Sequence, residues 1–139
     1  MKEVIWEFFK RHMSYSGEEL AKFKENPDFE RIIERGQEMN QWTVVAEVIK
    51  SEHCFSGHKV GDKFYLDPFG NLLTHKNPKR ICIYALEPLS KAIFHISEQL
   101  YAGRDPNEIV FRNYHCFDVG LACGGWGEIV VRVSVVKRQ

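Results

Sequence analysis

Two stretches rich in β-branched residues decide the fold class: residues 42–49, Trp42-Thr43-Val44-Val45-Ala46-Glu47-Val48-Ile49, and residues 128–136, Glu128-Ile129-Val130-Val131-Arg132-Val133-Ser134-Val135-Val136. Valine, isoleucine and threonine favour strands because their branched side chains pack well on a pleated surface. In the second stretch Val131, Val133 and Val135 alternate with Arg132 and Ser134, which predicts one buried and one exposed face. Shorter strands are expected at 63–66 and at 109–112.

The chain before residue 42 has helical spacing of its apolar residues. Ser16 and Glu19 have the spacing of a capping box, so a helix should begin after Ser16. A second helix is expected to restart at Asn26-Pro27, where proline occupies the first helical position, and to stop at Gly36. Residues 1–41 are therefore predicted to form a helical arm.

A third helical block is expected between the strands. Asn77 is its predicted N-cap, Pro88 should kink it because proline removes an amide donor, and Gly103 should end it. The predicted fold class is α+β: an N-terminal helical arm (1–41), then a compact domain (42–139) with a small, mostly antiparallel sheet packed on one kinked helix.

Composition narrows the function classes. Nineteen Lys and Arg residues balance nineteen Asp and Glu residues, which argues against a nucleic-acid module, since such modules carry a basic face. The sequence has no apolar run of the roughly 20 residues that span a bilayer, and its first residues do not read as a signal peptide. We expect a cytoplasmic protein with no nucleic-acid or membrane partner, whose four cysteines are thiols or ligands rather than disulfides.

Cysteine and histidine residues gather in two clusters. The first is His53-Cys54-Phe55-Ser56-Gly57-His58, and the second is His115-Cys116-Phe117-Asp118, with Cys123 in a glycine-rich stretch that follows. Thiolate and imidazole groups are the usual ligands of zinc and iron. We expect a zinc or iron site with ligands drawn from Cys54, His58, Cys82, Cys116 and Cys123. The alternative is that the cysteines are small, buried hydrophobic residues.

Catalytic roles are less well defined. Asp118 and His115 are candidates for proton transfer or for orienting an imidazole, although aspartates also form turns. His95 lies among apolar residues with helical spacing, so we expect it to be a hydrogen-bonded core histidine. Trp126, between glycines, is expected to cover an edge of the core.

From Trp42 onward the sequence resembles a family of small conserved-hypothetical bacterial and archaeal proteins without an assigned activity. The resemblance rests on Cys54 followed by Gly57-His58-Lys59-Val60-Gly61-Asp62, on Ile81-Cys82-Ile83-Tyr84-Ala85-Leu86, and on Cys116-Phe117-Asp118. It implies one α+β domain and singles out Cys54, His58, Cys82, Cys116 and Asp118. Members of the family often come from anaerobes. The helical arm and residues 121–127 are additions to that pattern.

The preferred functional hypothesis is a metal-binding accessory protein, or a small subunit of a larger enzyme system, such as an anaerobic one. A protein partner or a second copy would dock through apolar residues of the helical arm: Trp6, Phe8, Phe9, Phe23 and Phe29. One alternative is a small metal- or thiol-dependent enzyme, with Cys116 or Cys123 as a redox thiol. The other is an interaction domain whose cysteines only pack the core.

Overall fold

The computed structural model describes residues 2–138 and divides the chain into two compact units, Met1–Glu38 and Met39–Gln139. The first unit contains α1 (Lys2–Met13), α2 (Gly17–Lys24) and most of α3 (Phe29–Met39). The capping box is confirmed: Glu19 N donates to Ser16 Oγ at 3.1 Å, and Ser16 N donates to Glu19 Oε1 at 2.9 Å.

Aromatic contacts hold the helical unit together. The Trp6 ring meets Phe29 edge-on at 5.0 Å, and Phe9 lies 4.9 Å from Phe23. Four of the five apolar residues expected to form a docking surface therefore contact one another within this unit, and only Phe8 is mainly exposed. Docking through the arm stays a prediction.

Helix α3 differs at both ends from the helix predicted to run from Asn26-Pro27 to Gly36. The Asn26 side chain accepts a hydrogen bond from Asp28 N, and this turn delays the start of α3 to Phe29. The predicted stop at Gly36 is wrong because α3 continues to Met39, whose side chain is fully buried. A glycine inside a helix costs only about 1 kcal/mol, which burial of an apolar side chain can offset.

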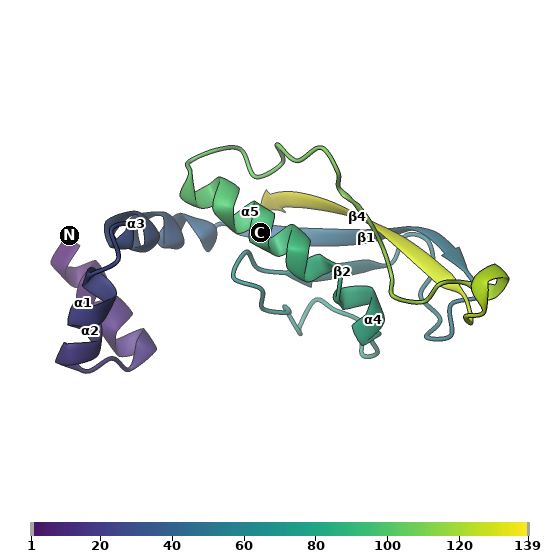
Figure 1. Cartoon of the computed structure of the whole chain (residues 1–139), viewed down its shortest axis with the longest axis horizontal. Helices are drawn as coiled ribbons and strands as arrows, with labels where there is room; N and C mark the ends of the chain where they lie inside the picture. Colours follow the sequence, from purple (N-terminus) through teal and green to yellow (C-terminus); the bar gives the residue numbers. More distant parts are fainter. Residues whose placement is uncertain (1, 139) are drawn as a thin grey trace. The chain divides into compact units, whose positions relative to one another are not determined.

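The second unit is built on a four-stranded antiparallel sheet with the order β2-β1-β4-β3 (Figure 1). Its strands are β1 (Trp42–Glu52), β2 (Lys63–Leu66), β3 (Asn113–His115) and β4 (Glu128–Lys137). Ala46 pairs with Val133 at the centre of the sheet, and both are fully buried. The alternation predicted for residues 131–135 is confirmed, since its valines are buried while Arg132 is exposed.

Helices cover one face of this sheet. The predicted interruption of the helix at Pro88 is confirmed, and it is a split: α4 (Ile83–Leu86) precedes Pro88 and α5 (Leu89–Tyr101) follows it. Figure 1 shows α5 lying across β1 and β4, and it contributes five buried side chains to the core: Leu89, Ala92, Ile93, Ile96 and Leu100. The α+β class is thus correct. None of the helices described within residues 2–138 has the length and apolar character needed to cross a bilayer.

Asn77 does not cap a helix, so that prediction is wrong. Its side chain forms two hydrogen bonds of 2.8 Å with the backbone of Tyr65, and a third with Leu73 O. The amide thus pairs with the outer edge of β2 as a strand would, which satisfies backbone groups at that edge. The next helix begins only after Cys82.

The strand expected at 109–112 is wrong for a similar reason. The Asn107 side chain pairs with the backbone N–H and C=O of Val135 at 2.9 and 2.8 Å, so it occupies that part of the β4 edge. Strand β3 begins at Asn113 instead.

His95 is exposed on α5 rather than buried. The buried positions of this helix include Ile93 and Ile96, and position 95 is rotated away from them.

Candidate functional site

Strand pairing brings both cysteine and histidine clusters to the same end of the sheet. Glu52, the last residue of β1, pairs with Glu128, the first residue of β4. His53 therefore lies beside Gly127, where an added Cβ would be 2.0 Å from the His53 carbonyl oxygen. On the other side of β4, Cys116 N donates to Ile129 O at 3.1 Å.

His58 is the most buried of the predicted site residues, with 5% of its surface exposed. Its Nε2 accepts a hydrogen bond from Cys82 N at 3.2 Å, and its ring meets Phe64 edge-on at 5.0 Å. Its carbonyl oxygen accepts the Ser51 hydroxyl. Burial lowers the pKa of His58, although Asp62 raises it in part. The imidazole is therefore held neutral, with its proton on Nδ1.

Three of the four thiols lie on segments that meet at this end of the sheet. Cys54, Cys82 and Cys116 are half-buried and pack against the core. The segments that carry them are joined by hydrogen bonds: Cys82 N to His58, and Phe117 N to Tyr84 O at 3.1 Å. The three predicted sequence motifs thus converge on one end of the domain.

Hydrogen bonds already engage some of the predicted ligand atoms. Cys116 Sγ accepts from Ile129 N at 3.4 Å, and His58 Nε2 accepts from Cys82 N. Cys123 is exposed at the end of a short 3-10 helix (Leu121–Cys123). No group of three or more Cys, His, Asp or Glu residues arranged to hold a metal ion occurs within residues 2–138. The metal site stays a prediction.

Asp118 organises the loop that connects β3 to β4. Its Oδ1 accepts Gly120 N at 3.0 Å and Trp126 N at 3.1 Å, and its Oδ2 accepts Gly127 N at 3.2 Å. An added Cβ on Gly125 would be 2.1 Å from Asp118 Oδ1. These amide hydrogen bonds, the one from Gly120 foremost, lower the pKa of Asp118, so the carboxylate is ionised at neutral pH. These hydrogen bonds show that Asp118 holds the loop in its conformation.

We expect Asp118→Ala to open this loop because three backbone amides lose their acceptor. Amide hydrogen exchange at Gly120, Trp126 and Gly127 should become at least about tenfold faster. Asp118→Asn keeps one carbonyl oxygen for Gly120 and Trp126, so it should affect mainly Gly127. Unchanged exchange in the alanine variant would contradict this role.

His115 is part of a charged cluster. Its Nε2 lies 3.1 Å from Glu128 Oε2, and the other oxygen of Glu128 accepts a hydrogen bond from Lys50. The adjacent carbonyl of Cys116 and the Glu128 carboxylate raise the pKa of His115. Lys50 and His115 lower the pKa of Glu128. No sequence pattern predicts this cluster, because Lys50 and Glu128 meet His115 only through strand pairing.

Large apolar side chains surround the same end of the domain, and we call them the aromatic end. Two ring pairs lie there: Phe55 with Trp126 at 5.3 Å, and Tyr84 with Phe117 at 5.5 Å. Trp126 is 71% exposed, so it does not cover the core edge as expected. The aromatic end comprises seven side chains that are each more than half exposed: Phe55, Ile83, Tyr84, Phe117, Val119, Leu121 and Trp126.

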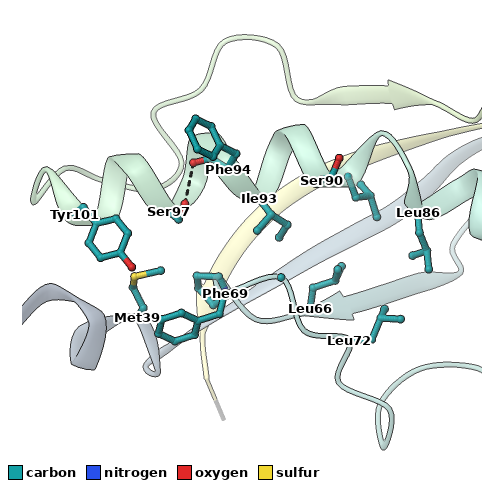
Figure 2. Close-up of a pocket in the computed structure, with 13 residues that line it drawn as sticks. Met39, Leu66, Phe69, Leu72, Leu86, Ser90, Ile93, Phe94, Ser97 and Tyr101 are labelled. Atoms are coloured by element: carbon teal, nitrogen blue, oxygen red, sulfur yellow. Dashed lines mark hydrogen bonds between the residues drawn. The ribbon is translucent and has the colours of Figure 1, made fainter. Parts of the chain in front are cut away.

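A separate apolar groove of about 510 Å³ lies between α5 and the turn that follows β2. Figure 2 shows Phe69 and Ile93 on its two sides, with Met39 and Tyr101 at one end. The Ser97 hydroxyl donates to Phe94 O within α5, so it is already satisfied. This groove therefore offers apolar contact and little polar recognition.

Comparison with known proteins adds no assignment. The chain matches no protein-family model, no curated protein and no solved structure at a significant level.

Proposed function

We propose that this protein is an accessory protein or small subunit that docks on a protein partner through the aromatic end. The observation that carries the proposal is the exposure of seven large apolar side chains around the convergent cysteine and histidine clusters. Large apolar side chains that gather at one end of a domain and stay exposed often mark an interaction site. Aromatic residues are also enriched among the residues that dominate binding energy at interfaces.

Charge supports a protein partner over a nucleic acid. Rings that stack on nucleic-acid bases are usually accompanied by free cations. Here Lys50 is paired with Glu128, and Asp118 adds another negative charge beside Trp126. The proposed location remains the cytoplasm, where the four free cysteines stay reduced.

The test is site-specific photo-crosslinking in native cells. A photoreactive phenylalanine analogue replaces Phe55 or Trp126, and the same analogue at Phe111 is the control. Phe111 is 86% exposed but lies outside the aromatic end. We expect one stoichiometric crosslinked partner from positions 55 and 126 and none from position 111.

Substitution gives the second measurement. The double variant Phe55→Ser with Trp126→Ser should abolish the purified complex, whereas Phe111→Ser should leave it intact. Both rings are exposed, so the double variant should fold normally. A complex that survives the double substitution would refute docking at this end, and so would equal crosslinking from all three positions.

Metal binding is a second candidate, supported by the hydrogen bonds that join the three segments carrying Cys54, His58, Cys82 and Cys116. Three thiols and an imidazole suit zinc or iron. The test is the metal content of protein purified without oxygen or chelator, compared with Cys54→Ser and Cys116→Ser variants. About one zinc or iron per chain, lost in both variants, is the expected result. Metal-free, folded wild-type protein would remove this candidate.

A further inference from the structure

The sheet face opposite α5 has a groove of about 560 Å³, a volume typical of small-molecule sites. Its floor follows the strand register: Tyr65 on β2 pairs with Val45 on β1, which pairs with Ser134 on β4. Thr43 lies two residues before Val45 on β1 and therefore on the same face of the sheet. The floor therefore presents three hydroxyl-bearing side chains: Thr43, Tyr65 and Ser134.

The charges around this groove are unbalanced. Glu47 is its one acidic residue, and Lys63 pairs with it at 3.8 Å. The ammonium of Lys137 lies over the Trp42 ring at 4.0 Å. Four lining cations have no carboxylate within 4.0 Å among residues 2–138, although Arg132 lies opposite Glu47 in the strand register: Lys76, Arg112, Arg132 and Lys137. Cations gathered without counter-ions favour an anionic ligand.

The arginine beside β3 is held in place without being neutralised. The Arg112 guanidinium donates to the carbonyl oxygens of Asn107 and Ile109, and the side chain is half-buried. These neutral acceptors fix its position but leave its positive charge uncompensated. On the β2 side, the Lys76 ammonium lies 5.7 Å from the centre of the Tyr65 ring. Positive charge thus lines both sides of the groove.

Thr43 supplies an independent observation. It is 2% exposed, and its Oγ1 has no hydrogen-bond partner among the residues that the structure describes. A buried hydroxyl without a partner is uncommon in native proteins and is usually satisfied by an additional group such as a water or a ligand. Thr43 lines the groove, and its enclosed Oγ1 is a polar atom beneath the groove floor that lacks a partner among the described residues.

We propose that this groove binds a small molecule that carries phosphate groups. Arginine binds phosphate oxygens with two parallel hydrogen bonds, and the floor hydroxyls add neutral donors. The groove is lined by five cations and one carboxylate, and the chain has no net charge, which favours a compact ligand over a long polyanion. The site lies on a different surface from the aromatic end and does not depend on the docking proposal.

The test is a titration of the full-length protein, followed by amide NMR, with inorganic pyrophosphate and with ADP. We expect saturable shifts at Thr43, Val45 and Ser134. Arg132 is exposed and makes no ion pair within 4.0 Å among residues 2–138, although it lies opposite Glu47 in the strand register, so Arg132→Gln should fold normally. It should weaken binding of both probes about tenfold, since one charge-assisted contact is lost.

Arg104→Gln is the matched control, because Arg104 is an exposed arginine outside the groove. It should change affinity by less than about twofold, as expected for a screened surface charge. Equal weakening by the two variants would overturn the proposal, and so would the absence of saturable shifts. Tighter binding of a mixed-sequence DNA duplex or of a phosphate-free acidic peptide would overturn it as well.

Discussion

Gly127→Ala should destabilise the second unit by about 3 kcal/mol or more, the largest effect we expect from a single methyl group. The added Cβ would lie 2.0 Å from His53 O and 2.4 Å from Glu52 O. Both contacts are with backbone atoms at the end of β1, so no side-chain rotation can relieve them. The strand pair β1–β4, which forms the centre of the sheet, would have to separate at this end. Chemical denaturation followed by circular dichroism measures the change.

Gly124→Ala is the control for this substitution. Gly124 lies in the same loop with φ of 92°, and an added Cβ there would meet open space. Only conformational strain is introduced, and it should cost about 1–2 kcal/mol. Gly127 does not have a positive φ, so equal losses of stability in the two variants would contradict the close approach of Gly127 to β1 as the cause.

Local patterns predicted the elements that depend on few neighbours. The capping box at Ser16 needs only residues within one helical turn, and Pro88 interrupts a helix through its own ring. The prediction for Asn77 was wrong for the opposite reason, and no role was predicted for Asn107. Asn77 and Asn107 are typical turn and cap residues, but their partners, Tyr65 and Val135, are distant in sequence. Nothing local marks an amide that pairs with a strand edge.

The candidate site shows the same division. The clusters around Cys54 and Cys116 were visible in the sequence, and antiparallel pairing of β1 with β4 places them at one end. The sequence did not predict the exposure of Phe55 and Phe117, because apolar residues in short segments read equally well as core. Nor did it predict the unpaired charge of Arg132. Strand alternation predicts that Arg132 lies outside the core. Which residues surround its side chain depends on the order of the strands in the sheet, which the sequence does not reveal.

His58→Ala should cost about 2–4 kcal/mol, the second large effect that we expect. The ring is buried against Phe64, so its removal leaves a cavity. The substitution also leaves the backbone N–H of Cys82, the N-cap residue of α4, without its hydrogen-bond acceptor. His58→Gln is the informative companion, because its amide oxygen can accept the same hydrogen bond and does not titrate. Denaturant midpoints at pH 8 should therefore rank wild type highest, the glutamine variant next and the alanine variant lowest.

The pH dependence of stability separates the charge of His58 from its packing. Burial lowers its pKa in the folded state, so the unfolded chain binds the proton more readily. The stability contributed by neutral His58 is then fully present above the unfolded value of about 6.5 and is lost as pH falls toward the folded value, at up to about 1.4 kcal/mol per pH unit. His115 has a raised pKa and acts in the opposite direction, but it is present in both proteins and cancels in a comparison of wild type with His58→Gln. Between pH 7 and 5 the wild type should lose more stability than His58→Gln, and parallel profiles would show that His58 is not held neutral by the fold.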